Sequence, residues 1–251
     1  MNNQLKDKVA VMTGGTTGIG LATAKAFVAE GAEVIITGRR QAELNAAVAA
    51  IGLGATGVRA DSAKMSDLDH LFDVVKKRQG RIDVLFVNAG GGDMVPIGAI
   101  SEKHFDDIFD RNVKGVLFTV QKALPLLSKG ASVILTGSTT SIKGTASFSV
   151  YSASKAAVRN FARSWILDLK DRSIRVNTLS PGPIHTPGLV GLAGNDAAQQ
   201  QGFLDSFATQ VPLGRVGQPE EVAKAAIFLA SEASSFMTGA ELFVDGGLAQ
   251  I

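Results

Sequence analysis

The chain has 251 residues, of which 45% are hydrophobic, so it can bury the core of one large α/β domain or of two smaller ones. Its 25 basic and 23 acidic residues leave a formal charge of +2 and are scattered along the chain, which argues against a nucleic-acid partner. The absence of cysteine excludes disulfides, thiolate zinc sites and cysteine nucleophiles, and the three histidines lack the spacing of metal ligands, so we expect no bound metal.

The chain carries no membrane or targeting signal. Its first ten residues lack the apolar stretch of a signal peptide, and no apolar run approaches the roughly 18 residues that a membrane span needs. No linker, charge block or repeat divides the sequence. We therefore expect one domain over residues 1–251, a cytoplasmic location and no membrane partner.

Seven short β-branched runs predict strands, separated mostly by ten or more residues of helical periodicity. In chain order they are residues 8–13, 33–37, 55–60, 83–88, 132–137, 174–180 and 241–245. Apolar strands joined by helical crossovers predict a parallel seven-stranded sheet with helices on both faces, a doubly wound α/β fold. Ligands of such folds bind beyond the carboxyl ends of the strands, so the residues that follow each run are the candidates.

A glycine-rich turn with Gly14, Gly18 and Gly20 follows the first run and opens a helical segment. A strand, a glycine turn and a helix in this order present backbone N–H groups and a helix N-terminus to a phosphate. The spacing is neither Gly-x-Gly-x-x-Gly nor that of a P-loop. A tight strand-to-helix turn with close packing is therefore the alternative interpretation.

Arg39 and Arg40 follow the second run, where an adenosine ribose would lie. A 2′-phosphate there calls for arginine, whereas a 2′-hydroxyl calls for a carboxylate. One charge-assisted hydrogen bond contributes about 1.5 to 3 kcal/mol, roughly ten- to a hundred-fold in affinity, so this position favours NADP(H) over NAD(H). Asp61, after the third run, could accept from an adenine amino group. The glycines from Gly90 onward, after the fourth run, would let backbone approach a planar ring.

The only tyrosine of the chain, Tyr151, stands four residues before Lys155 in a segment of helical periodicity. Residues four apart share one helix face, and this face continues through apolar Val158, Ala162 and Trp165. A hydroxyl beside an ammonium at the mouth of a buried stripe is a candidate for proton transfer. An ordinary surface pair is the alternative.

Together these residues resemble the classical short-chain dehydrogenase/reductase family over essentially the whole chain. The resemblance is carried by TGGTTGIG, NAG at residues 88–90, the asparagine of DRNVKG, the serine of ILTGSTTS, YSASK, SPGPIHT, RVGQPEEVA and the terminal VDGG, in the family's order. Gly137, where a second serine is common, and the glycine-rich NAGGGD are departures that affect loop shape. The resemblance implies a single Rossmann-type domain and an NADP(H)-dependent carbonyl reductase or alcohol dehydrogenase.

The resemblance also implies the site residues. The catalytic set would be Asn112, Ser138, Tyr151 and Lys155. Tyr151 would exchange a proton with the substrate oxygen, its pKa lowered by the lysine ammonium and a nicotinamide cation, while Ser138 donates to the same oxygen and Asn112 holds a water. The cofactor set would be Gly14, Thr16, Thr17, Gly18, Ile19, Gly20, Arg39, Arg40, Asp61, Ser62, Asn88, Ala89, Gly90, Tyr151, Lys155, Pro181, Gly182, Ile184 and Thr186.

Residues 187–210 combine glycines with small and apolar side chains, as a mobile lid over a substrate would, or else form a plain surface helix pair. With Met94, Val95, Thr140, Ile142 and Phe148, this segment would line a mostly apolar, uncharged pocket for a small carbonyl or alcohol substrate. The resemblance further suggests a homotetramer, with which Phe105, Phe109, Phe161 and Trp165 are compatible. An NAD-linked dehydrogenase and a dinucleotide-sensing protein without turnover are the alternatives, and the sequence does not name the substrate.

Overall fold

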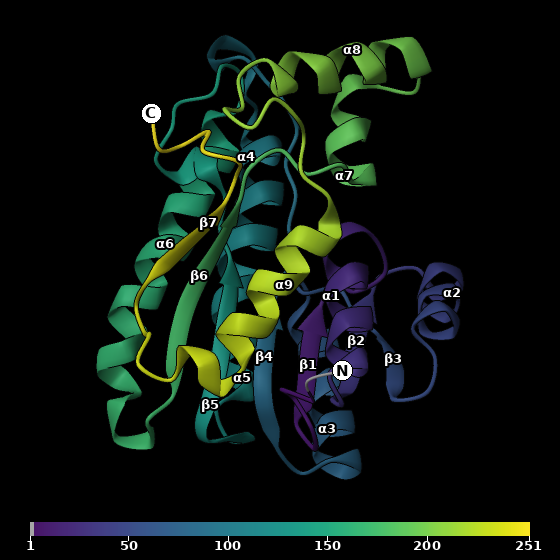
Figure 1. The fold of residues 1–251 in the computed structure, drawn as a ribbon, viewed down its shortest axis with the longest axis vertical. Coiled ribbons are helices and arrows are strands. Elements are labelled where there is room, and N and C mark those ends of the chain that lie inside the picture. The colour runs from purple at the N-terminus through teal and green to yellow at the C-terminus, as the bar shows by residue number, and fades with distance from the viewer. Residues whose placement is uncertain (1–2) are drawn as a thin grey trace.

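The structure, a computed structural model, describes residues 3–251 and has a sheet of seven parallel strands at its centre (Figure 1). The order across the sheet is β3-β2-β1-β4-β5-β6-β7. The strands are β1 (Val9–Thr13), β2 (Glu33–Gly38), β3 (Ala55–Arg59), β4 (Ile82–Val87), β5 (Leu127–Thr136), β6 (Arg175–Pro181) and β7 (Glu241–Val244). The predicted doubly wound fold is confirmed.

Strand β5 is longer than the sequence predicts, because it begins at Leu127 rather than at residue 132. Leu127 is buried and pairs with Ile82, and the register with β4 then shifts between Ile82 and Val84. Gly130, at φ +78°, adopts a conformation that favours glycine within this irregular stretch. The predicted run begins only after this glycine and the polar residues beside it.

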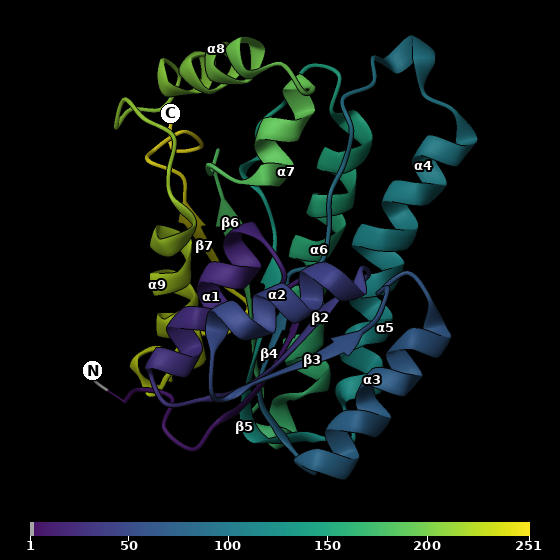
Figure 2. The ribbon, with the colours of Figure 1, turned by 90° about the vertical axis from the view of Figure 1, so that its right-hand side faces the viewer.

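Helices cover both faces of the sheet (Figure 2). On one face lie α1 (Gly18–Ala29), α2 (Gln41–Ile51) and α9 (Pro219–Ala230), and on the other α3 (Met65–Arg78), α5 (Gly115–Ala123) and α6 (Ser149–Asp168). Strand side chains alternate between the two cores, as the period of a strand requires. Across four paired strands, Val11, Leu85, Val133 and Val176 enter the core under α3, α5 and α6, and the next residues along, Met12, Phe86 and Ile134, enter the core under α1 and α9.

The chain order reverses between β1 and β4, which lie side by side, so a crevice opens beyond their carboxyl ends. Two helices stand above this edge of the sheet, α7 (Pro187–Val190) and α8 (Ala197–Ala208) (Figures 1 and 2). Both lie within the segment for which we predicted a lid. Across residues 3–251, no helix combines the length and the apolar character that a bilayer crossing requires.

Candidate active site

A cavity of about 750 Å³ lies at the carboxyl ends of the strands and runs from the glycine turn to α8. Every residue predicted to bind the cofactor lines it, and so do Ser138, Tyr151 and Lys155. Asn112 is fully buried directly behind the wall. The structure thus brings together, from eight separate stretches of chain, the residues that the sequence singled out.

The glycine turn after β1 packs closely against the backbone around it and leaves the N-terminus of α1 open to a ligand. Gly14 and Gly18 have φ values of +67° and +52°, and a Cβ at Gly20 would lie 2.0 Å from the carbonyl oxygen of Gly14. Thr17 precedes α1 in an extended conformation and its side chain does not cap the helix, whose first turn contains no acidic residue. The N–H groups of that turn are therefore free of a side-chain partner and suit a phosphate.

The two arginines after β2 differ in their surroundings. The Nε of Arg40 lies 2.5 Å from Oε1 of Glu43, one turn along α2. Arg39 is exposed, lines the cavity and forms no ion pair with any residue between 3 and 251. A Cβ at Gly38 would lie 2.4 Å from Cγ2 of Thr16, so glycine lets the end of β2 pack closely against the glycine turn. Arg39 is thus the better placed cation for a 2′-phosphate.

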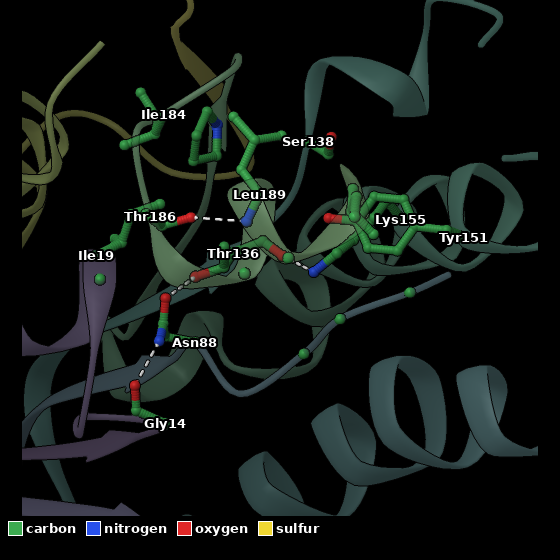
Figure 3. Close-up of a pocket in the computed structure, with 18 of the residues that line it drawn as sticks. Gly14, Ile19, Asn88, Thr136, Ser138, Tyr151, Lys155, Ile184, Thr186 and Leu189 are labelled. Carbon is green, nitrogen blue, oxygen red and sulfur yellow. Dashed lines mark hydrogen bonds between the residues drawn. The ribbon is translucent and has the colours of Figure 1, made fainter. Parts of the chain in front are cut away.

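Asn88, the first residue after β4, connects the glycine turn with the catalytic end of the cavity (Figure 3). Its amide Nδ2 donates to the carbonyl oxygen of Gly14 at 2.9 Å, and its Oδ1 lies 3.5 Å from the hydroxyl of Thr136. The carbonyl oxygen of Thr136 in turn accepts from Nζ of Lys155 at 2.8 Å. A row of polar contacts therefore runs across the ends of β1, β4 and β5.

Tyr151 and Lys155 occupy the first two turns of α6, as the sequence predicts. Nζ of Lys155 lies 5.5 Å from the centroid of the Tyr151 ring, and Phe148 stacks on that ring at 4.4 Å. A Cβ at Gly92 would lie 2.6 Å from Cδ2 of Tyr151. The unusual glycine run after β4 therefore leaves room for the tyrosine ring.

Burial controls the protonation of both groups. It raises the pKa of Tyr151 from 10.0 to about 12, against a smaller lowering by the hydrogen bond with Ser138. It lowers the pKa of Lys155 from 10.5 to about 8. In the free protein, desolvation of the phenolate has the largest effect and raises the Tyr151 pKa. The sequence-based expectation was a lowering of this pKa by the lysine ammonium and a bound nicotinamide cation. At neutral pH the phenol holds its proton and Lys155 is mostly charged.

Ser138 lies at the end of β5, just before the 3-10 turn η3 (Thr139–Ser141). Its Oγ accepts from the backbone N–H of Thr140 at 3.2 Å and from the hydroxyl of Thr140 at 3.0 Å. Because a hydroxyl has one proton and two lone pairs, the proton of Ser138 remains available for a donated hydrogen bond. Gly137, the departure noted in the sequence, has a cause here, because a Cβ would lie 2.3 Å from Oγ of Ser180.

Asn112 lies in a π-helical turn (Asp110–Lys114) between α4 (Glu102–Phe109) and α5. Its amide Nδ2 donates to the carbonyl of Gly91 and to Oγ of Ser154, both at 3.0 Å, and its Oδ1 accepts from the N–H of Gly91 at 3.1 Å. A Cβ at Gly90 would fall 3.1 Å from Oδ1 of Asn112 and 3.2 Å from Nζ of Lys155. Asn112 therefore fixes the glycine loop beside the lysine.

The segment after β6 bends over the cavity. Ile184 is buried, and Oγ1 of Thr186 accepts from the N–H of Leu189 at 3.1 Å to cap α7 (Figure 3). A Cβ at Gly182 would lie 2.7 Å from Cα of Asp245, so this loop packs against the C-terminal segment. Both Ile184 and Thr186 line the cavity, while the Ile184 side chain also belongs to the core under α1 and α9.

The substrate end differs from the expectation in two respects. Met94, Thr140 and Phe148 line the cavity, whereas Val95 and Ile142 do not. The N–H of Val95 instead donates to the carbonyl of Ser147, and Ile142 is exposed. The segment 187–210 contributes to the lining, as the sequence predicts, through residues that include Leu189, Leu192, Phe203, Phe207 and Gln210. The lining is not uncharged, however, and the sequence analysis missed several of its members, among them Asp93, Arg111, Lys143 and Leu248. No sequence signal singled out these four residues.

A parallel α/β sheet with a phosphate-binding turn, together with a half-buried tyrosine and a buried lysine at the same crevice, defines a dinucleotide-dependent oxidoreductase. The family model described as enoyl-(acyl carrier protein) reductase matches residues 14–249. The chain belongs to the short-chain dehydrogenase/reductase family, whose members use nicotinamide dinucleotides.

Individual relatives match the chain from end to end. It is 50% identical over 250 residues to the oxidoreductase asL5 of Sarocladium schorii, covering 99% of this chain and 98% of that protein. It is 36% identical to the NADP-dependent (R)-specific alcohol dehydrogenase of Lentilactobacillus kefiri, covering 98% of each. A crystal structure of a short-chain dehydrogenase/reductase, described as a glucose/ribitol dehydrogenase, from Brucella melitensis superposes with a TM-score of 0.91 at 31% identity, covering 98% of each chain.

Proposed function

We propose that the protein is an NADP(H)-dependent oxidoreductase that interconverts a ketone or aldehyde and the corresponding alcohol, with Tyr151 as the general acid and base. The observation that carries the proposal is the convergence of a half-buried phenol, a buried ammonium and the Ser138 hydroxyl on one cavity whose other end offers a phosphate-binding turn. The whole chain would form this unit, with residues 187–210 as a lid over the substrate.

The residues present fit a nicotinamide dinucleotide, which supplies or accepts the hydride at the substrate carbon when bound. Ser138 and Tyr151 both have a proton to donate to a carbonyl oxygen, and the Tyr151 proton passes to that oxygen as negative charge develops. The phenolate left behind is stabilised by the Lys155 ammonium nearby. In alcohol oxidation the Tyr151 phenolate accepts the proton of the substrate hydroxyl.

The test of turnover is NADPH consumption with a panel of ketones from different chemical classes. We expect steady consumption with at least one ketone, and loss of turnover in Tyr151→Phe with retained NADPH binding. Ser164→Ala, on the exposed part of the same helix, is the control. Cofactor binding without turnover on any member of the panel would favour the dinucleotide-sensing alternative.

Arg39 supports the choice of NADP(H), because it is the one of the two arginines after β2 that has no acidic partner in residues 3–251. The NADP-dependence of the Lentilactobacillus kefiri relative agrees with this choice. Arg39→Ala should lower the ratio of kcat/KM for NADPH to that for NADH by roughly ten- to a hundred-fold. Arg40→Ala should lower it less, since Arg40 pairs with Glu43. An unchanged ratio in Arg39→Ala would favour the NAD-linked alternative.

A homotetramer and a cytoplasmic location belong to the same proposal. Two stacked aromatic pairs, Phe105 with Phe109 on α4 and Phe161 with Trp165 on α6, lie on neighbouring helices, and Phe105 is 45% exposed. Such a surface suits contact with a second copy. Light scattering of the purified protein would give four protomers, and Phe105→Glu should lower that number.

A further inference from the structure

A buried carboxylate lies directly behind the catalytic end of the cavity. Glu241, the first residue of β7, has a side chain that is only 8% exposed. Its Oε1 accepts from the hydroxyl of Ser180 at 2.7 Å and from that of Ser141 at 3.1 Å, and its Oε2 meets the guanidinium of Arg159. Glu241 is not among the residues that line the cavity, so it does not touch a substrate there.

Two of the three partners of Glu241 are adjacent to catalytic groups. The N–H of Ser141 donates to the carbonyl of Ser138 at 3.0 Å, closing the turn η3 that presents the Ser138 hydroxyl. Arg159 lies on α6, one turn after Lys155 and two turns after Tyr151. The Glu241 carboxylate therefore joins the turn that carries the serine to the helix that carries the tyrosine and the lysine.

The third partner fixes the backbone between them. The hydroxyl of Ser180 occupies the space beside Gly137, where a Cβ would lie 2.3 Å from it. Its hydrogen bond to Glu241 holds the hydroxyl in this position. The residue immediately before Ser138 is thus packed against an atom that the same carboxylate orients.

We propose that Glu241 is a positioning residue for the reaction, which sets the placement of Ser138 relative to Tyr151 through Ser141, Ser180 and Arg159. The inference rests on the proposed function. Its physical basis is that a carboxylate withdrawn from water is costly unless it is paired and hydrogen-bonded, so the network favours one arrangement of all its members. A misplacement of about 1 Å at reacting groups can lower a rate roughly a hundred-fold.

The test uses the full-length protein and mild variants that each remove one connection. Ser141→Ala removes the connection to η3, Arg159→Met removes the charge on α6 while keeping an apolar stem, and Glu241→Gln keeps the shape of the side chain. Arg159→Lys serves as the conservative rescue. The control is Arg81→Met, which breaks an ion pair with Asp83 at the opposite end of the sheet.

We normalise kcat to the number of NADPH-binding sites and expect Ser141→Ala and Arg159→Met each to lower it roughly ten-fold. The KM for NADPH should be unchanged. Arg159→Lys should recover part of the lost kcat. Counting sites by NADPH titration separates misplacement from a mere loss of folded protein. In the double variant that combines Ser141→Ala with Arg159→Met, the fall in kcat should be smaller than the product of the two single effects. Both substitutions act through the same Glu241 carboxylate. The proposal would be overturned if kcat per site equalled that of the wild type in Ser141→Ala, Arg159→Met and Glu241→Gln.

A second readout separates this inference from the proposed function. Tyr151 is the only tyrosine, so tyrosine labelled with ¹³C at the ring Cζ gives a single NMR signal. If the wild type turns over no ketone, the proposed function fails and this signal decides the inference. A shift in Ser141→Ala and Arg159→Met, absent in Arg81→Met, supports positioning, whereas an unmoved signal overturns it.

Discussion

Lys155 should destabilise the free protein at neutral pH, and Lys155→Met tests this. Burial lowers the pKa of this lysine from 10.5 in the unfolded chain to about 8 in the folded protein. Between these two values the unfolded state binds more protons, so the stability of the wild type rises as the pH rises through this window. By linkage, burial of this ammonium lowers the free energy of unfolding by about 3 kcal/mol at pH 7 and by about 1 kcal/mol at pH 10.

The methionine variant removes this cost but also loses the hydrogen bond that Nζ donates to the carbonyl of Thr136. That loss is about 1 kcal/mol. The variant should therefore be more stable than the wild type by about 2 kcal/mol at pH 7 and about equally stable at pH 10. The dependence of this difference on pH is the diagnostic quantity, because Tyr151 and all other groups are common to both proteins.

The assay is urea unfolding of both proteins at matched protomer concentration, without nucleotide, at pH 7 and pH 10. Lys77→Met, on the exposed part of α3, is the control for the same lysine-to-methionine change made at the surface. A Lys155→Met difference that is the same at both pH values would refute the reasoning that desolvation dominates at this site. Lower stability of the variant at pH 7 would refute it equally.

Three further predictions concern the same end of the cavity. Phenolate formation changes the ultraviolet absorbance, and this change reports Tyr151 alone because the chain has one tyrosine. In the free protein its midpoint should lie near pH 12, well above 10. A midpoint at or below pH 10 would contradict the conclusion that burial has the largest effect on this pKa. Gly92→Ala places a Cβ 2.6 Å from the Tyr151 ring, so kcat in ketone reduction should fall while KM for NADPH is retained; full kcat would show that the ring has room to move. Gly137→Ala should lower the free energy of unfolding in urea by about 1 to 3 kcal/mol, because the added Cβ meets Oγ of Ser180. The double variant Gly137→Ala with Ser180→Ala should regain part of this stability, because the second substitution removes the Ser180 hydroxyl.

The sequence predicted the fold well because its signals are local. Runs such as 33–37 are apolar and β-branched, and the helices between them have clear periodicity, so strand positions and parallel pairing follow. The start of β5 was missed because Gly130 and the polar residues beside it resemble a loop, while the pairing of Leu127 with Ile82 is a tertiary effect. The π-helical turn around Asn112 also has no local signature, since tertiary hydrogen bonds to Gly91 and Ser154 hold its central residue.

The candidate site was predictable where residues follow strand ends and not where they arrive from elsewhere. Arg39 and Asn88 directly follow β2 and β4, and their places at the cavity follow from the topology. Lys143 and Leu248 reach it from segments 105 residues apart, joined by the hydrogen bond that Lys143 donates to the Leu248 carbonyl. The expected lowering of the Tyr151 pKa includes a bound nicotinamide cation, and the raised pKa of the free protein was not foreseen because charge proximity is visible in a sequence whereas desolvation is not.

The cavity has one wall of backbone and one wall of side chains, and this difference bears on how such an enzyme can diversify. At Gly14, Gly20 and Gly92 a single added carbon would collide with neighbouring atoms, so that wall tolerates almost no mutational drift. The opposite wall, from α8 and residues 143–148, consists of side chains that can change size without moving a strand. New substrates can therefore be acquired by altering one side of the crevice while coenzyme recognition on the other side is inherited intact.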